Sequence, residues 1–175
     1  MRYAEPTQPR AAEKLRTVAI GEIIVSAAPE DVLVTYGLGS CVAICLYDPV
    51  ARVGGMLHAL LPSAPTRIEV ACASARFVEQ GVPLLLEAMQ RMSTRGSRLI
   101  ARVCGGARIL SAPGFEQSLS IGERNIQAAE DALRLAGLRI KNQDIGGRSG
   151  RTVKIYAATG RVTVKKLGQP ERALE

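Results

Sequence analysis

Short apolar runs separated by turn-forming residues make up most of the sequence, and their order limits the folds that the chain can adopt. From residue 17 onward each run is rich in β-branched or apolar residues and is bounded by Gly, Pro, Asp or Asn, which is typical of short strands. The predicted strands are 18–25, 32–36, 41–47, 53–61, 98–104, 138–142, 152–157 and 161–167. They precede, separate and follow two predicted helices without a regular βαβ alternation. This order indicates an α+β fold with helices packed against a mixed or antiparallel sheet.

The two helices are predicted at about 77–93 and 123–136. The second has an apolar face at helical spacing, made by Ile126, Ala129, Leu133 and Ala136. Gly137 follows that face and is a typical C-terminal cap. Pro83 lies inside the first segment, which is compatible with a helix only if the first turn starts close to it.

Length and composition indicate one folded domain. The chain has 175 residues, 47% of them hydrophobic, with a mean hydropathy of +0.09, enough to bury a sizeable core. Residues 1–16 are polar, charged and proline-bearing, and we expect a disordered N-terminal extension there. The domain is predicted to span 17–168, with a C-terminal tail at 169–175.

The charge balance permits an acidic partner without choosing one. The net charge is +7, and basic residues gather in the segments 91–108 and 134–154. The more common interpretation of such segments is a solvated surface, and the functional alternative is a docking face for an acidic protein. Aromatic residues make up 3% of the chain and there is no Trp, which counts against binding of single-stranded nucleic acid, so no nucleic-acid partner is expected.

Membrane insertion and secretion are not expected. The longest uncharged stretch, 32–47, is shorter than a membrane span and contains glycines, and the N-terminus lacks the apolar region of a secretory signal. We therefore expect a cytoplasmic protein. Its four cysteines, Cys41, Cys45, Cys72 and Cys104, are then expected to be reduced thiols.

The block from Thr35 to Cys41, Thr-Tyr-Gly-Leu-Gly-Ser-Cys, is the most informative motif, and His58 is the only histidine in the chain. A cysteine acts as a nucleophile through its thiolate, and a neighbouring imidazole can take the thiol proton. The spacing of Cys41 and His58 is compatible with two adjacent strands. Gly37 and Gly39 would let the backbone turn sharply and leave amide N–H groups free to hold an oxyanion.

Simpler interpretations remain open from the residues alone. A cysteine at the start of a strand is more often a small buried apolar residue than a nucleophile. Strand alternation places Cys45 on the same face as Cys41, so Cys45 is an equal candidate by position. No paired C-x-x-C spacing favours zinc, and Gly37-x-Gly39 lacks the third glycine and following helix of a dinucleotide loop.

Taken together, these motifs resemble the chemoreceptor glutamine deamidase family, CheD. The resemblance rests on Thr35–Pro49, Gly54-Gly55-Met56-Leu57-His58, Leu61-Pro62, Gly105-Gly106-Ala107, Ile121-Gly122-Glu123-Arg124-Asn125 and Asp144-Ile145-Gly146-Gly147. It covers about 17–168, with the blocks in the family's order. It implies a layered α/β sandwich of α/β/α type with a mixed sheet, similar to cytotoxic necrotizing factor-like cysteine hydrolases.

The resemblance also implies an activity and a site. It implies a protein-glutamine glutaminase that converts receptor glutamines to glutamates with release of ammonia. Cys41 would be the nucleophile, His58 the general base and Thr35 the group that orients the imidazole. The backbone at Gly37, Gly39 and Ser40 would support the oxyanion, and no metal or organic cofactor is required. The expected partners are chemoreceptor cytoplasmic domains and, in some bacteria, a CheC-type phosphatase; the alternative is a non-catalytic module that docks to either.

Overall fold

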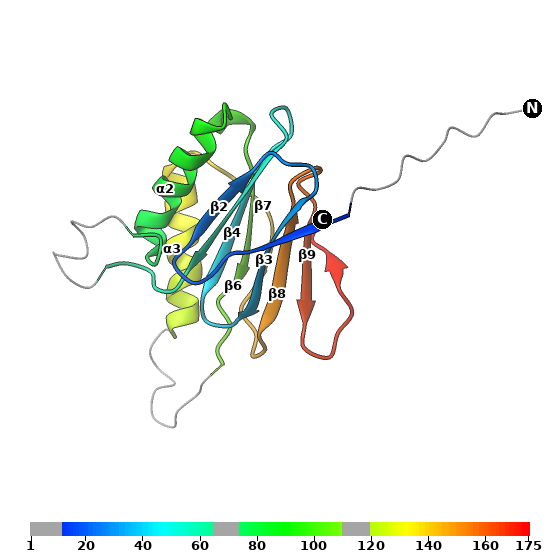
Figure 1. The fold of residues 1–175 in the computed structure, drawn as a ribbon. Helices are drawn as coiled ribbons and strands as arrows, with labels where there is room; N and C mark the ends of the chain where they lie inside the picture. The colour runs from blue at the N-terminus through cyan, green and yellow to red at the C-terminus, as the bar shows by residue number, and fades with distance from the viewer. Residues whose placement is uncertain (1–11, 65–73, 110–119) are drawn as a thin grey trace, which may run out of the picture.

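The computed structural model describes residues 12–64, 74–109 and 120–175, and in this part of the chain two sheets and two long helices form three layers. Figure 1 shows the two helices on one side, a first sheet in the middle and a second sheet on the far side. Two of the catalytic residues that the sequence predicts lie on different sheets, Thr35 on the second and His58 on the central sheet. The packing of the two sheets therefore sets the distance between their side chains.

The central sheet has the strand order β2-β5-β4-β6-β7. Its strands are β2 (Ile23–Ser26), β4 (Val42–Asp48), β5 (Val53–Ala59), β6 (Ile100–Gly105) and β7 (Ile140–Ile145). The strand β4 is antiparallel to both β5 and β6, whereas β6 and β7 run parallel. The sheet is therefore mixed, as the sequence predicts.

The second sheet has the order β1-β3-β8-β9-β10. Its strands are β1 (Lys14–Thr17), β3 (Asp31–Leu38), β8 (Arg151–Tyr156), β9 (Val162–Lys166) and β10 (Arg172–Ala173). β1 and β3 are parallel, and the other pairs are antiparallel. Between the sheets lies an apolar cluster that includes Leu33, Ala43, Cys45, Met56 and Ile155.

The helices α2 (Val78–Arg91) and α3 (Ile121–Leu135) cover the outer face of the central sheet. Their buried side chains pack on sheet residues such as Leu57 and Val103. Gly55 lets α2 approach closely, because a Cβ there would lie 2.7 Å from the Met89 sulfur. The short 3₁₀ helix η1 (Gly96–Arg98) leads from α2 towards β6. Among the described residues, no helix combines the length and apolarity that crossing a bilayer requires.

The prediction of an α+β fold in layers with a mixed sheet is confirmed, but the layer order differs from the α/β/α type. Both helices lie on one face, and the other face is covered by the second sheet. The physical reason is that β3, β8 and β9 have apolar faces of their own, and these pack on the central sheet through Leu33, Val153 and Val164.

Several element boundaries also differ from the prediction. The predicted strand 18–25 is a turn followed by the shorter β2, because Gly21 has a φ of +78°. Pro83 lies beyond the first turn of α2, which begins at Val78. The domain limits stay a prediction: residues 1–11 lie outside the described residues, β1 begins before residue 17, and β10 lies within the predicted tail.

Candidate active site

Cys41 directly precedes β4, His58 lies on the adjacent strand β5, and both face the same side of the central sheet. Ala43 of β4 pairs directly with His58 of β5, and Cys41 precedes Ala43 by two residues, so it occupies the diagonal position. Both side chains are buried between the sheets, with 8% of Cys41 and 4% of His58 exposed. The strand pairing that the spacing predicts is therefore present.

The imidazole of His58 is held through its Nδ1 atom. Nδ1 lies 2.9 Å from the hydroxyl oxygen of Thr35 and 3.2 Å from the carbonyl oxygen of Val18. A carbonyl oxygen can only accept, so the ring proton is on Nδ1 and donates to Val18. The neutral ring then carries its free lone pair on Nε2.

The Nε2 atom of His58 is buried and has no hydrogen-bond partner among the described residues. Burial lowers the pKa of His58, an effect that the hydrogen bond to the Val18 carbonyl opposes. The ring is therefore neutral near pH 7 and presents an unused base between the two sheets. This is the protonation state that a general base for a thiol requires.

The thiol of Cys41 is also neutral at rest. Burial raises its pKa, and its own backbone amide opposes the shift. In the described part of the chain no hydrogen bond joins this thiol to the imidazole. Such contacts are often longer in a free enzyme and tighten when substrate binds. The arrangement thus requires proton transfer at the moment of attack, since no ion pair exists beforehand.

Thr35 reaches His58 from the second sheet. It lies on β3, next to a register shift between Thr35 and Leu38 in the pairing with β8. Gly37 lies within this irregularity with a φ of +63°, a conformation that glycine adopts at no steric cost. Gly37 therefore shapes the bulge through which the chain leaves β3, upstream of the loop that precedes Cys41.

The loop at Gly39, Ser40 and Cys41 is tied to the scaffold by its carbonyl groups. The Gly39 carbonyl accepts from the Ala107 amide at 2.8 Å, and the Cys41 carbonyl accepts from the Gly106 amide at 2.8 Å. The Ser40 carbonyl between them accepts from the side-chain amide of Asn125 at 2.8 Å. Within the described residues the amides of Ser40 and Cys41 donate to no other residue, and the Cys41 amide contacts only its own thiol. Both amides are therefore available to a ligand that displaces this local contact.

The other cysteines are placed differently. Cys45 pairs with Met56, is fully buried in the sheet-to-sheet core, and burial raises its pKa well above the ordinary value. Burial and the nearby Asp144 carboxylate raise the pKa of Cys104 to about 12. Cys41, Cys45 and Cys104 are free thiols, and Cys72 lies outside the described residues. Of these two candidates Cys41, which directly precedes β4, is the less deeply buried residue, with 8% exposed against 1% for Cys45.

Two contributors to the site carried no predicted role. The Val18 carbonyl leaves no signal in a sequence, because every residue has a carbonyl group. Asn125 does leave one: it continues the buried stripe that Ala129 and Leu133 form on α3. A polar side chain in an apolar stripe needs a buried partner, and here the partners are backbone carbonyls.

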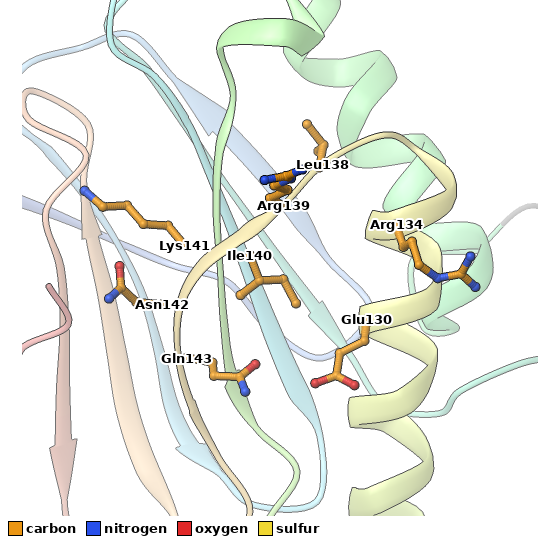
Figure 2. A pocket seen from close by; sticks show the side chains of 8 residues that line it. All are labelled: Glu130, Arg134, Leu138, Arg139, Ile140, Lys141, Asn142 and Gln143. Carbon is orange, nitrogen blue, oxygen red and sulfur yellow. The ribbon is translucent and has the colours of Figure 1, made fainter.

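The basic segments are mostly paired with acidic groups in space. Arg91, Arg98 and Arg108 form ion pairs with Glu87, Asp48 and Glu123. An open pocket of about 560 Å³ between α3 and β7 is lined by Glu130, Arg134, Leu138, Arg139, Ile140, Lys141, Asn142 and Gln143. Figure 2 shows Arg134 and Lys141 pointing away from each other, so these cations do not converge on one ligand. The pocket contains none of the candidate catalytic residues.

Within 12–64, 74–109 and 120–175, no three or more His, Cys, Asp or Glu side chains gather as a metal site would require. The candidate site itself contains one imidazole and one accessible thiol. Its chemistry is therefore described by these two groups, the Thr35 hydroxyl and the backbone amides of the loop.

Comparisons with known proteins agree on one family. The family model described as CheD chemotactic sensory transduction matches residues 60–166. A relative from Symbiobacterium thermophilum, named probable chemoreceptor glutamine deamidase CheD, is 40% identical over 161 residues, covering 92% of this chain and 98% of the relative. So long a match necessarily includes Thr35, Cys41 and His58.

Relatives in other organisms match over similar lengths. A relative from Geobacter metallireducens, named probable chemoreceptor glutamine deamidase CheD 2, is 40% identical over 92% of this chain and 99% of its own length. One from Pyrococcus abyssi is 42% identical over 86% of this chain and 90% of its own. Among solved structures, hypothetical protein YfiH of Bacillus licheniformis is 14% identical, with a TM-score of 0.45 over 78% of this chain and 59% of that chain.

Proposed function

This chain belongs to the CheD family, and from that premise we propose that it is a protein-glutamine deamidase that acts on chemoreceptors. It hydrolyses the side-chain amides of receptor glutamines to glutamates and releases ammonia. The catalytic group is the Cys41 thiol, His58 is its general base, and Thr35 orients the imidazole. The proposal is carried by one observation: the free Nε2 of a neutral His58 lies on the same sheet face as Cys41.

The first half-reaction forms a thioester. Nε2 of His58 takes the thiol proton, and the sulfur attacks the side-chain carbonyl carbon of glutamine. The carbonyl oxygen becomes an oxyanion, which the amides of Ser40 and Cys41 stabilise; one such donor typically contributes about 3 kcal/mol. Protonated His58 then gives its proton to the departing nitrogen. The C–N bond breaks, ammonia leaves, and a γ-glutamyl thioester remains on Cys41.

The second half-reaction restores the enzyme. His58 takes a proton from water, and the resulting hydroxide attacks the thioester carbon. The C–S bond breaks, the sulfur recovers the proton from His58, and glutamate is released. Each cycle consumes one amide and one water and yields one carboxylate and one ammonia, with the proton that the new carboxylic acid loses taken up by the ammonia as ammonium. No step needs a metal or organic cofactor.

The partners follow from the same family membership. The proposed substrate is the cytoplasmic domain of chemoreceptors, so we expect the reaction to take place in the cytoplasm. Each event adds a negative charge to a receptor helix and changes the repulsion between neighbouring helices. A CheC-type phosphatase is a second proposed partner, as the resemblance implies for some bacteria.

A non-catalytic module that docks to a receptor or a CheC-type phosphatase is the competing function. It is favoured by the raised pKa of the Cys41 thiol, because an inert buried cysteine has the same property. The two functions differ in the reactivity of Cys41. A docking module predicts no reaction of this thiol with an amide, whereas the deamidase requires turnover.

The proposal is tested by mass spectrometry of a chemoreceptor cytoplasmic fragment incubated with wild-type protein, Cys41→Ala and Cys45→Ala. The wild type and Cys45→Ala are expected to convert the same glutamines to glutamates, whereas Cys41→Ala converts none. Cys45→Ala is the matched control, because it removes a thiol from the same strand face. A folded wild type that converts no glutamine in receptors from its own organism would favour the docking module.

A further inference from the structure

We propose that Asn125 is a positioning residue that sets the direction of the oxyanion-binding amides. The inference rests on the proposed deamidation, because it concerns how the same site stabilises the transition state. Asn125 lies in the first turns of α3, is completely buried, and its side chain hydrogen-bonds to neither Cys41 nor His58. It acts instead through backbone carbonyl groups that lie near Cys41 and His58 in the sequence.

Both donor hydrogens of the Asn125 amide are used. Nδ2 donates to the Ser40 carbonyl at 2.8 Å and to the Leu60 carbonyl at 2.9 Å. Ser40 directly precedes the candidate nucleophile, and Leu60 follows the candidate base by two residues. One side chain thus joins the loop that carries Cys41 to the end of the strand that carries His58.

The bond to Ser40 fixes the orientation of a peptide unit. All peptide bonds in the described residues are trans, so the carbonyl of one residue and the amide of the next point in opposite directions. With the Ser40 carbonyl directed at Asn125, the Cys41 amide points away from α3. In the same way, the bond from Ala107 to the Gly39 carbonyl turns the Ser40 amide outward.

The Cys41 amide is the central member of this arrangement. Apart from the thiol of Cys41 itself, Asn125 is the only side chain among the described residues that is bonded to this peptide unit. The neighbouring carbonyls of Gly39 and Cys41 are held by backbone amides, which no substitution of a side chain removes. Asn125 is therefore the point at which a mutation can release the loop without altering the loop's own sequence.

Two glycines bring Asn125 into range. A Cβ on Gly122 would lie 2.5 Å from the Gly106 carbonyl oxygen, and a Cβ on Gly106 would lie 2.4 Å from Ile126. The start of α3 therefore rests directly on the backbone that follows β6. Ser120 and Glu123 cap the helix reciprocally and fix where its first turn begins.

The test separates formation of an oxyanion from reactivity of the thiol. Asn125→Ala is compared with wild type in kcat and KM for a chemoreceptor fragment, and in the rate at which iodoacetamide alkylates Cys41. Deamidation passes through an oxyanion, whereas alkylation of a thiol by iodoacetamide does not. Alkylation is followed by peptide mass spectrometry, so that Cys41 is counted apart from Cys72.

We expect Asn125→Ala to lower kcat roughly 10- to 100-fold, with KM and Cys41 alkylation changed less than about threefold. Leu133→Ala is the matched control on the same helix. It removes a buried side chain and lowers the melting temperature without touching the loop, so its kcat should stay near wild type. Asn125→Gln retains both donors on a longer side chain and is expected to recover part of the lost kcat.

Three outcomes would overturn the inference. If folded Asn125→Ala keeps the wild-type kcat while Cys41→Ala is inactive, the deamidase proposal stands and the role of Asn125 is wrong. If alkylation of Cys41 falls in parallel with kcat, Asn125 has a general structural role in the site and not an oxyanion role. A wild type without activity would remove the deamidase proposal, and this inference with it.

Discussion

A single imidazole determines the chemistry that the site can perform at a given pH. His58 is neutral because it is buried, and its Nδ1 proton is committed to the Val18 carbonyl. Thr35 adds a second contact from the opposite sheet, so the ring cannot rotate without losing both. The proposed base is thus oriented before substrate arrives, which lowers the entropic cost of the proposed proton transfer.

The pH dependence of deamidation follows from these shifts. In the proposed mechanism only the neutral ring accepts the thiol proton, so kcat/KM should rise with pH through an apparent pKa below 6.5, the ordinary value of histidine. It should then stay level until the Cys41 thiol ionises, above its ordinary pKa. The measurement is a pH profile of initial rates on a receptor fragment. A rising limb centred clearly above pH 7 would contradict a neutral His58 at rest.

At the scale of the elements, the hairpin of β4 and β5 carries both catalytic candidates, and one buried carboxylate secures its closed end. Asp48 accepts hydrogen bonds from the amides of Val50 and Ala51 within the hairpin. It also accepts from the Arg95 amide and from the Arg98 guanidinium, which ties the hairpin to the segment before β6. Burial alone would raise its pKa, but these donors together lower the pKa of Asp48 well below its ordinary value.

Asp48→Asn is expected to lower the free energy of unfolding by about 2–4 kcal/mol. The substitution leaves the half-buried Arg98 without its counter-charge. It also places the side-chain NH2 group of Asn against backbone amides that donate to the Asp48 carboxylate. Urea denaturation measures the change. The control is Glu87→Gln, which removes the exposed ion pair with Arg91 and should change stability by less than about 0.5 kcal/mol. Equal effects of the two substitutions would show that burial of Asp48 has no energetic role.

At the scale of the whole molecule, the last residues of the chain connect the two sheets. Leu174 is buried in the cluster between the sheets, and its amide donates to the Val162 carbonyl. Arg102 of the central sheet donates to the carbonyls of Leu174, which follows β10, and Gly160, in the turn between β8 and β9 of the second sheet. The residues around β10 therefore hold the two sheets together through buried contacts. The sequence predicts a C-terminal tail for this segment.

Deletion of residues 170–175 should destabilise the protein by about 2–4 kcal/mol, since it exposes the Leu174 site and leaves Arg102 without one of its carbonyl partners. The check is the urea midpoint of the truncated chain. Leu167→Ser, at a side chain that is 89% exposed near the same end, is the control and should be nearly neutral. A deletion as mild as this control would mean that the segment is a tail after all.

The sequence by itself determined the features that depend on local spacing. Apolar runs broken by Gly and Pro predicted most of the strands and both helices. The motifs from Thr35 to Gly147 identified the family before any geometry was known. Alternation along β4 also placed Cys41 and Cys45 on one face correctly. These properties depend on residues a few positions apart, so the chain carries them without reference to its fold.

Only the tertiary structure decided which element covers each face of the central sheet and which groups surround the candidate catalytic residues. Alternation shows that a face is apolar but not whether a helix or a second sheet packs on it, and so the position of the second sheet could not be predicted. The Val18 carbonyl contacts His58, which lies 40 residues further along the chain. Asn125 on α3 contacts Ser40, from which it is separated by 85 residues in the sequence. Such contacts form because packing brings distant backbone together, and a carbonyl group carries no residue type by which a sequence could reveal it.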